Sequence, residues 1–223
     1  MDIQKILEYG EKCYNAKYIH VENDGDYAIE RDGDIVYLLF QQSNSKEDWK
    51  NNFDFPAKPY KDMEIPWKCH RGFLKVWKSI EPYIENTVLD QTVKKFIIIG
   101  YSHGAAIATL AHEYVWFHRP DLREHGLEGY GFGCPRCYWG LFIDIELEKR
   151  WENFYPIRNC HDIVTHVPPI IFGFRHIGQL ISVGKTNQYV IRKNIFKCVD
   201  AHRWENYRYS LTNEIKEFTI QND

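Results

Sequence analysis

The sequence predicts a single α/β domain whose central sheet is mostly parallel and flanked by helices. Apolar runs of strand length alternate with longer stretches of helical periodicity through the middle of the chain, as in parallel sheets covered by helices. The 223 residues are enough for one domain with a sizeable core. A hydrophobic content of 44% and an aromatic content of 16% are typical of a globular protein.

The first 65 residues predict a helix, a hairpin and an irregular segment. An amphipathic helix ends near Asn15, because the apolar residues before it recur on one helical face. A hairpin follows over residues 27–40, with its turn at Asp32-Gly33. Its second strand, residues 35–40, is apolar throughout, which indicates a central place in the sheet. Residues 46–65 show no clean periodicity, and we expect them to cover the fold without regular structure.

The middle of the chain predicts the elements of the parallel region. Residues 71–85 carry an apolar stripe at helical spacing and predict a helix, in which Pro82 favours a kink. Residues 96–99 form a short apolar strand. The helix predicted after it, residues 105–118, is apolar on nearly every side, so we expect it to be buried against the sheet. Residues 129–133 predict another short strand.

The last third of the chain completes one domain. Its predicted elements are a helix over residues 141–151, a strand over 153–159, a late hairpin formed by 179–183 and 188–191, and a packed tail over 211–220. Pro156 indicates a bulge or a sheet edge in the strand that contains it. We see no repeat and no linker, and divide residues 1–223 into an N-terminal helix and hairpin (1–40), a core (35–207) and a C-terminal tail (208–223).

One motif stands at the centre of this pattern. The apolar strand ends at Gly100, and Gly100-Tyr101-Ser102-His103-Gly104 has the spacing G-x-S-x-G directly before a helix. In this turn glycines occupy the crowded flanks, and the serine hydroxyl is held out at the carboxyl end of the strand. The backbone N–H of His103 then opens the helix, with the positive end of the helix dipole behind it. The sequence therefore predicts Ser102 as a nucleophile.

A nucleophilic serine needs a histidine base, and the base needs an orienting carboxylate. After a turn of this kind the acid follows the serine and the histidine follows the acid. We favour Asp162, because it lies just beyond the strand that ends at Asn159. Three other acids fall in a helical pattern and favour a solvated face: Asp144, Glu146 and Glu148. Asp200 is close in sequence to a histidine, but the pattern does not place it in the fold.

The base is sought among the histidines that follow Asp162. We favour His202, which lies in a polar loop after the last predicted hairpin. His166 is too close to Asp162 in the sequence to reach round to Ser102 easily. His176 is the second choice for the base, although a structural hydrogen bond is its favoured role.

Composition excludes several classes of function. The net charge is −3 and no block of Lys or Arg stands out, which argues against a nucleic-acid partner. No apolar stretch reaches the roughly 18 residues that span a membrane, so we expect no integral membrane segment. The first residues lack a basic stretch followed by an apolar one, and on that ground we expect a cytoplasmic protein.

The six cysteines predict neither disulfides nor a metal site. Without an export signal we expect all six thiols to be reduced. Cys134-Pro135-Arg136-Cys137 has C-x-x-C spacing, but a zinc site needs a second pair and none is visible. No metal and no cofactor are therefore predicted.

The chain resembles the class 3 lipases, a fungal-type family with the α/β-hydrolase fold, from about Ile35 to Tyr207. The motifs that carry the resemblance are Leu39-Phe40 with Ser43 and Asp48-Trp49, Cys69 to Phe73, Gly100 to Ala105, Gly131 to Arg136, Asn159 to Pro169, His176-Ile177-Gly178, and Ala201-His202 with Tyr207. The resemblance implies Ser102 as nucleophile, Asp162 as orienting acid and His202 as base. It also implies oxyanion donors at the backbone N–H groups of Ser43 and His103.

Two departures from the family pattern are visible. The family usually has Phe-Arg-Gly before the oxyanion residue, where this chain has Phe40-Gln41-Gln42. The family turn commonly reads Gly-His-Ser-Leu-Gly-Gly, and here it reads Gly-Tyr-Ser-His-Gly-Ala over residues 100–105.

These observations predict a serine hydrolase that cleaves carboxylic esters through an acyl-enzyme on Ser102, with a small-molecule ester or acylglycerol as substrate. The alternative is a catalytically silent binding or scaffold protein that keeps the hydrolase fold. The sequence does not define the oligomeric state. A probe directed at the active serine distinguishes enzyme from scaffold.

The predicted substrate site favours short or medium acyl chains. The stretch that corresponds to a lipase lid, residues 45–53, carries two lysines, two acids and two asparagines beside the aromatics Trp49 and Phe53. Such a charged segment buries poorly in lipid, so we expect an esterase that works in solution. The candidate walls of the acyl pocket are Phe55, Trp67, Ile170, Ile171 and Phe172, with plain core packing as the equally weighted alternative.

Overall fold

The structure, a computed structural model, describes residues 2–42, 57–60, 67–140, 145–184 and 200–222. Its helices are α1 (Ile3–Asn15), α3 (Arg71–Leu89), α4 (His103–His118), α5 (Ile145–Lys149) and α8 (Trp204–Asn222), with short 3-10 turns η1 (Glu22–Asp24), η2 (Pro120–Leu122), η3 (Val164–His166) and η4 (Ile170–Phe172). Its strands are β1 (Ile19–Val21), β2 (Gly25–Asp32), β3 (Ile35–Gln42), β4 (Ala57–Tyr60), β5 (Trp67–His70), β6 (Lys95–Tyr101), β7 (Leu127–Phe132), β8 (Tyr138–Trp139), β9 (Phe154–Asn159), β10 (Phe174–Arg175) and β11 (Ile181–Val183).

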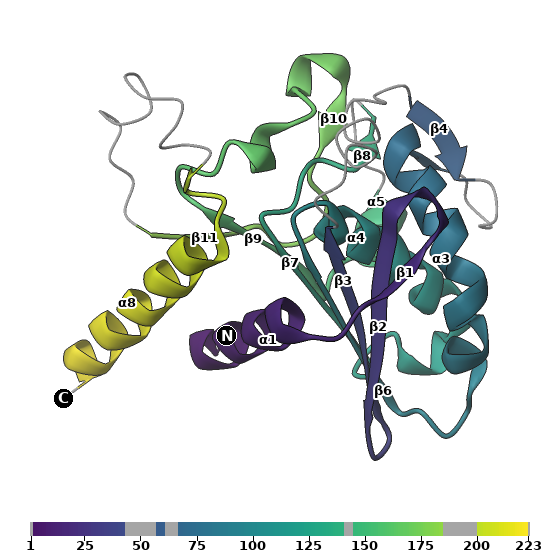
Figure 1. Cartoon of the computed structure of the whole chain (residues 1–223), viewed down its shortest axis with the longest axis horizontal. Coiled ribbons are helices and arrows are strands. Elements are labelled where there is room, and N and C mark those ends of the chain that lie inside the picture. Colours follow the sequence, from purple (N-terminus) through teal and green to yellow (C-terminus); the bar gives the residue numbers. More distant parts are fainter. Residues whose placement is uncertain (1, 43–56, 61–66, 141–144, 185–199, 223) are drawn as a thin grey trace.

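The central sheet has the order β1-β2-β3-β6-β7-β9-β11. The pairs from β3 to β11 are parallel, and only β1 and β2 add antiparallel pairs at one side. Helices α3 and α4 pack on one face of the sheet, and α1 and α8 pack on the other (Figure 1). This is the predicted α/β-hydrolase architecture, with a mostly parallel sheet between two layers of helices.

The apolar strand β6 serves both faces of the sheet. Side chains alternate along a strand, so Ile98 lies in the core cluster under α4 while Ile97 and Ile99 lie in the cluster under α1 and α8. A strand covered on both faces reads as an unbroken apolar run, which explains why the sequence identified β6. The predicted burial of α4 is confirmed, since every residue from His103 to Val115 is buried.

Helix α8 packs against α1, so that segments nearly 200 residues apart lie side by side (Figure 1). The indole of Trp204 lies over Gly10, where an added Cβ would come within 2.0 Å of the ring. This contact explains the glycine inside the first predicted helix, because no side chain fits there. Nη2 of Arg208 donates to Oε2 of Glu11 at 2.7 Å and joins the same two helices.

A second, smaller sheet was not predicted. Its order is β10-β8-β5-β4, and all its pairs are antiparallel. Strand β4 lies inside residues 46–65, for which no regular structure was expected. The structure describes only this strand, Ala57–Tyr60, within that range. The strands of this sheet have two to four residues, too short to show a periodicity in the sequence.

One prediction for the last third of the chain needs correction, and another is described only in part. Strand β11 pairs in parallel with β9, Ile181 beside Ile157, while residues 188–191, the other arm of the predicted hairpin, lie outside the described part. Strand β9 lies inside the sheet rather than at an edge. The carbonyl of Ile157 accepts from the backbone N–H of Gly133, the residue after β7. The polar groups of Pro156 therefore face the β11 side, where pairing begins only at residue 157. The missing N–H of proline therefore leaves no bond unmade.

Helices and cysteines complete the comparison. Of the helix predicted over residues 141–151 the structure describes α5 alone, while α3 runs through Pro82 to Leu89. Within the described residues no helix combines the length and apolarity that crossing a bilayer requires. Five cysteines are described, and no disulfide joins any two of them: Cys13, Cys69, Cys134, Cys137 and Cys160.

Candidate active site

Ser102 lies in a strained turn between β6 and α4. Its φ of 58° and ψ of −126° are unusual for a residue with a side chain, and its backbone N–H donates to the carbonyl of Phe132 at 2.8 Å. A Cβ on Gly100 would lie 2.2 Å from the carbonyl oxygen of Gly104, and a Cβ on Gly104 would lie 2.2 Å from that of Phe40. Both glycines are therefore required for β6, α4 and β3 to approach so closely.

The structure brings Ser102 together with His202 and Asp162. Nε2 of His202 is 2.7 Å from Oγ of Ser102, and Nδ1 is 2.8 Å from Oδ2 of Asp162. An ionised carboxylate only accepts hydrogen bonds, so Nδ1 carries the proton and Nε2 is left to accept from the serine hydroxyl. The three side chains come from the end of β6, the turn after β9 and the turn before α8.

Asp162 is fully buried, and its charge is balanced by donors. Oδ1 accepts from the backbone N–H of Val164 at 2.9 Å, and Oδ2 accepts from the Tyr207 hydroxyl at 2.5 Å as well as from His202. Burial, and then the negative charge of Asp162, raise the pKa of Tyr207 well above its ordinary value, so the phenol keeps the proton that it donates. The sequence reasoning gave Tyr207 no role, because its hydroxyl meets Asp162 only in the folded chain.

Gly133 closes the edge of this arrangement. Its φ is +60°, and a Cβ there would lie 2.6 Å from Cε1 and 2.9 Å from Nδ1 of His202, and 3.1 Å from Oδ2 of Asp162. The imidazole and the carboxylate therefore pack against bare backbone at this position. Only glycine combines this φ with room for the ring.

The alternative histidines make other contacts. Nε2 of His176 is 2.7 Å from the carbonyl of Thr165, and burial lowers the pKa of His176 to about 4. This histidine is neutral at pH 7 and donates a structural hydrogen bond, as the sequence favoured. Burial, with help from the charge of Arg136, also lowers the pKa of His166, whose Nδ1 lies 3.4 Å from Nη2 of that arginine.

The alternative acids lie away from Ser102 in the contacts that the structure describes. Asp200 is exposed, with Oδ1 3.2 Å from Nε of Arg203, and Glu146 and Glu148 are exposed on α5. Asp144 lies outside the described residues. Asp162 is thus the candidate acid that contacts His202.

Of the two predicted oxyanion donors, the structure describes one. His103 begins α4, and its ring is buried 5.1 Å from the ring of Phe73, centroid to centroid. Its backbone N–H lies at the positive end of the α4 dipole, where negative charge is stabilised. Ser43 lies outside the described residues, so the oxyanion role of both remains a prediction.

The predicted substrate-binding residues fall into three groups. Trp49, Phe53 and Phe55 lie outside the described residues. Trp67 is buried in the core, with its ring 5.0 Å from that of Trp151, which is the core packing weighed as its alternative.

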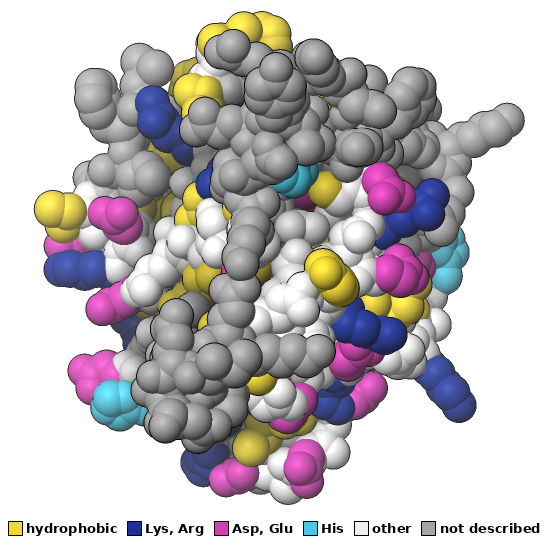
Figure 2. Space-filling view, turned by 90° about the vertical axis from the view of Figure 1, so that its left-hand side faces the viewer, with side chains coloured by type: hydrophobic (Ala, Val, Ile, Leu, Met, Phe, Trp, Pro, Cys, Tyr) yellow, Lys and Arg dark blue, Asp and Glu magenta, His cyan; other side chains and the backbone are white. Residues whose placement is uncertain are grey.

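The third group is exposed. Ile170, Ile171 and Phe172 form η4 and are 54%, 86% and 54% exposed. Figure 2 shows hydrophobic side chains at the upper edge of the molecule, the level at which Figure 1 draws the turn before β10. These residues are at a surface rather than inside a closed pocket, and their role in binding an acyl chain remains a prediction.

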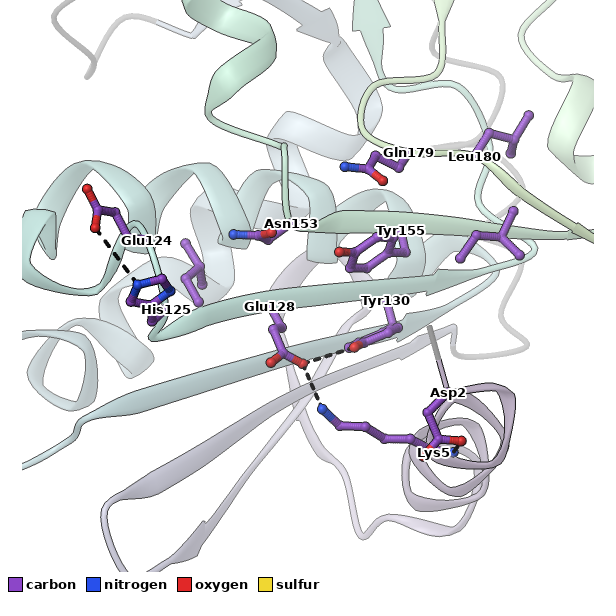
Figure 3. A pocket seen from close by; sticks show the side chains of 12 residues that line it. Asp2, Lys5, Glu124, His125, Glu128, Tyr130, Asn153, Tyr155, Gln179 and Leu180 are labelled. Atoms are coloured by element: carbon purple, nitrogen blue, oxygen red, sulfur yellow. Dashed lines mark hydrogen bonds and ion pairs between the residues drawn. The ribbon is translucent and has the colours of Figure 1, made fainter.

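A cavity of about 650 Å³ lies elsewhere, between α1 and the sheet (Figure 3). Glu128, near the start of β7, lines this cavity. Ser102 lies at the other end of the same strand, where its backbone N–H donates to the carbonyl of Phe132. Glu128 accepts from Lys5 at 3.2 Å and from the Tyr130 hydroxyl at 2.9 Å, both of which also line the cavity. The charge of Glu128 is therefore used within the fold, and the cavity lies away from the candidate catalytic residues.

Comparison with known proteins decides the family. Residues 37–172 match the family described as "Lipase (class 3)". The chain belongs to the class 3 lipase family. The resemblance inferred from the motifs is thereby confirmed.

Two relatives and one solved structure show the extent of the similarity. The chain is 30% identical over 147 residues to the secreted mono- and diacylglycerol lipase 1 of Fusarium solani, covering 63% of this chain and 41% of that one. It is 30% identical over 185 residues to a lipase of Rhizomucor miehei, covering 80% and 48%. A structure described as a triacylglycerol lipase with a serine protease triad at its catalytic centre is 26% identical, with a TM-score of 0.66 and coverage of 76% and 66%. The chain thus spans less than half the length of these two curated relatives.

The relatives also correct one prediction. The expected cytoplasmic location is wrong, because the mono- and diacylglycerol lipase 1 of Fusarium solani is named as secreted, as is a similar lipase of Malassezia globosa. These names point to an extracellular location. The argument for six reduced thiols used the same reasoning about an export signal, and it loses that support.

Proposed function

We propose that the chain hydrolyses carboxylic esters, with Ser102 as nucleophile, His202 as general base and Asp162 as the acid that orients the base. The observation that carries this proposal is the continuous contact from Oγ of Ser102 through both imidazole nitrogens to a buried carboxylate. Membership of a lipase family supports the same chemistry.

The proposed reaction has two halves. Nε2 of His202 takes the proton of Ser102 as Oγ attacks the acyl carbonyl, and the imidazolium that forms is stabilised by Asp162. Backbone N–H groups of His103 and Ser43 hold the oxyanion, the former with the dipole of α4 behind it. His202 then gives its proton to the departing alcohol, and an acyl-enzyme remains on Ser102. His202 takes a proton from water as the water oxygen attacks the acyl carbon. It then returns that proton to Oγ of Ser102 as the acyl–Oγ bond breaks and the carboxylic acid leaves.

The proposed substrate is an acylglycerol or a related ester with short or medium acyl chains. The names of the relatives support the acylglycerol class, since they include mono-, di- and triacylglycerol lipases. The charged composition of residues 45–53 supports the shorter chains, because two lysines and two acids beside two aromatic residues make a poor apolar lid. A series of p-nitrophenyl esters of increasing acyl length tests this part of the proposal.

A fluorophosphonate probe tests the chemistry directly. We expect the probe to label wild type and to leave Ser102→Ala unlabelled, and we expect Ser102→Ala, His202→Ala and Asp162→Asn each to lose activity by orders of magnitude. The triple variant should be scarcely worse than the worst single one, because the three groups act as one unit. His176→Ala is the matched control and should remain active. Labelling that does not depend on Ser102 would favour the silent scaffold instead.

A further inference from the structure

Tyr101 directly precedes Ser102 and contacts His202 in two ways. Its hydroxyl donates a hydrogen bond to the backbone carbonyl of His202. Its ring lies almost parallel to the imidazole, with 5.4 Å between centroids and an angle of 12° between planes. One side chain thus holds both the backbone and the ring plane of the candidate base.

The two hydrogen bonds of the imidazole leave one motion unrestrained. Nδ1 is fixed on Asp162 and Nε2 on Ser102, but rotation of the ring about the line through these nitrogens breaks neither contact at once. A flat aromatic ring against the face of the imidazole opposes this rotation, and offset stacking of such rings is favourable. Tyr101 supplies that surface, so it opposes the rotation of the imidazole that the two hydrogen bonds leave free.

The main chain of the base is held in the same manner. The carbonyl of Ala201 accepts from Nδ2 of Asn159 at 3.1 Å, and the carbonyl of His202 accepts from Tyr101. Asn159 ends β9 and Tyr101 ends β6, so side chains at two strand ends anchor consecutive peptide groups of the turn before α8. These two hydrogen bonds thereby fix the main chain of His202 relative to the central sheet.

Tyr101 is itself fixed by three aromatic edges. The ring of Tyr14 on α1 lies 6.3 Å away at 83°, and those of Trp204 and Tyr207 on α8 lie 6.2 Å and 6.5 Å away at 81° and 87°. Burial, with the negative charge of Asp162, raises the pKa of Tyr101 above its ordinary value. The phenol therefore remains protonated and available as a donor at neutral pH.

We propose that Tyr101 is a positioning residue that holds His202 in the orientation required to accept the Ser102 proton. It restrains the ring plane by stacking and restrains the main chain through its hydroxyl. This inference rests on the proposed ester hydrolysis for its kinetic consequence, but the restraint itself is a property of the fold.

The test compares Tyr101→Phe, which keeps the ring, with Tyr101→Leu, which keeps neither ring nor hydroxyl. We expect kcat to fall about tenfold in Tyr101→Phe and about 100-fold in Tyr101→Leu, with KM within about twofold, because misplacement of the base affects the transition state rather than substrate binding. Tyr83→Leu is the matched control, since it removes a tyrosine ring that stacks on Tyr27 at 5.8 Å and has no part in holding Tyr101 or His202 in the contacts described above. Its kcat should equal that of wild type.

A second readout reports on the imidazole without turnover. The proton between Nδ1 of His202 and Asp162 gives a downfield NMR signal, and we expect Tyr101→Phe and Tyr101→Leu to broaden it by faster exchange with water while Tyr83→Leu leaves it sharp. Wild-type kcat with an unchanged signal in both Tyr101 variants would overturn the inference. If no ester is hydrolysed yet the signal depends on Tyr101, the positioning role stands and the proposed function fails. If activity depends on Ser102 but neither the signal nor kcat changes in the Tyr101 variants, the proposed function stands and the positioning role of Tyr101 fails.

Discussion

Replacement of Gly133 by alanine tests the geometry of the base most directly. The new Cβ would lie 2.6 Å from Cε1 of His202, about 0.8 Å inside the ordinary limit of 3.4 Å for such contacts. The imidazole is already bonded at both nitrogens, so a retreat of that size lengthens its contact with Ser102 or with Asp162. A misplacement near 1 Å costs about 100-fold in rate, and we expect kcat of Gly133→Ala to fall by that factor.

The same substitution also strains the backbone, and a control separates the two effects. A left-handed φ costs a residue with a side chain about 1–2 kcal/mol, which lowers Tm by about 2–8 °C in a domain of this size. Gly33 has the same φ of +60° but has nothing within 4 Å of an added Cβ. Gly33→Ala should therefore lose a similar amount of stability and keep its activity.

Ester hydrolysis by purified variants is the assay for kcat and KM, and thermal unfolding gives Tm. Wild-type kcat in Gly133→Ala would refute the view that His202 is closely packed against this glycine. Equal loss of activity in Gly33→Ala would show that general instability, and not displacement of the base, lowers the rate.

Three further expectations concern the acid, the core and the substrate. Tyr207→Phe removes a donor from the buried Asp162, so we expect kcat to fall about tenfold and the free energy of unfolding to fall by about 1–3 kcal/mol, measured by kinetics and urea unfolding; unchanged values would remove Tyr207 from the site. Burial lowers the pKa of His112 from 6.5 to about 3, so its contribution to stability is present above pH 6.5 and is lost as the pH falls toward 3. His112→Leu should flatten the fall in unfolding free energy between pH 6.5 and 4 by about 3 kcal/mol, and a curve parallel to that of wild type would contradict this. Hydrolysis of a short-chain triglyceride should rise smoothly across its solubility limit, whereas a steep rise once droplets appear would replace the solution esterase by an interfacially activated lipase.

The turn around Ser102 was predictable because its constraints are local. Gly100 and Gly104 are required by contacts that any strand-turn-helix of this tightness makes, so the requirement is visible in five consecutive residues. Asp162 and His202 were chosen by their places after a strand and in a loop, and the structure brings both to Ser102. Their positions followed from topology, since the carboxyl ends of parallel strands meet at one edge of the sheet.

Contacts between distant residues left no comparable trace in the sequence. The hydroxyl of Tyr101 meets a carbonyl 101 residues later, and no spacing rule connects two such positions. Residues 181–183 were identified as a strand, but the propensity of a strand does not say which strand it will pair with, and the parallel pairing with β9 was not predicted for that reason. The prediction of a cytoplasmic location was wrong for a different reason, because it was based on the first residues of the sequence rather than on any property of the fold.

The packing of α8 on α1 has a consequence for the order in which the protein becomes competent. His202 lies two residues before Trp204, and that indole packs on Gly10, so the segment bearing the base is placed by contact between two helices that lie nearly 200 residues apart in the sequence. A nascent chain can build β6 and its strained turn early, yet Ser102 has no base until α8 docks. Recovery of activity during refolding should therefore trail the return of secondary structure, reporting the final long-range docking event of the fold.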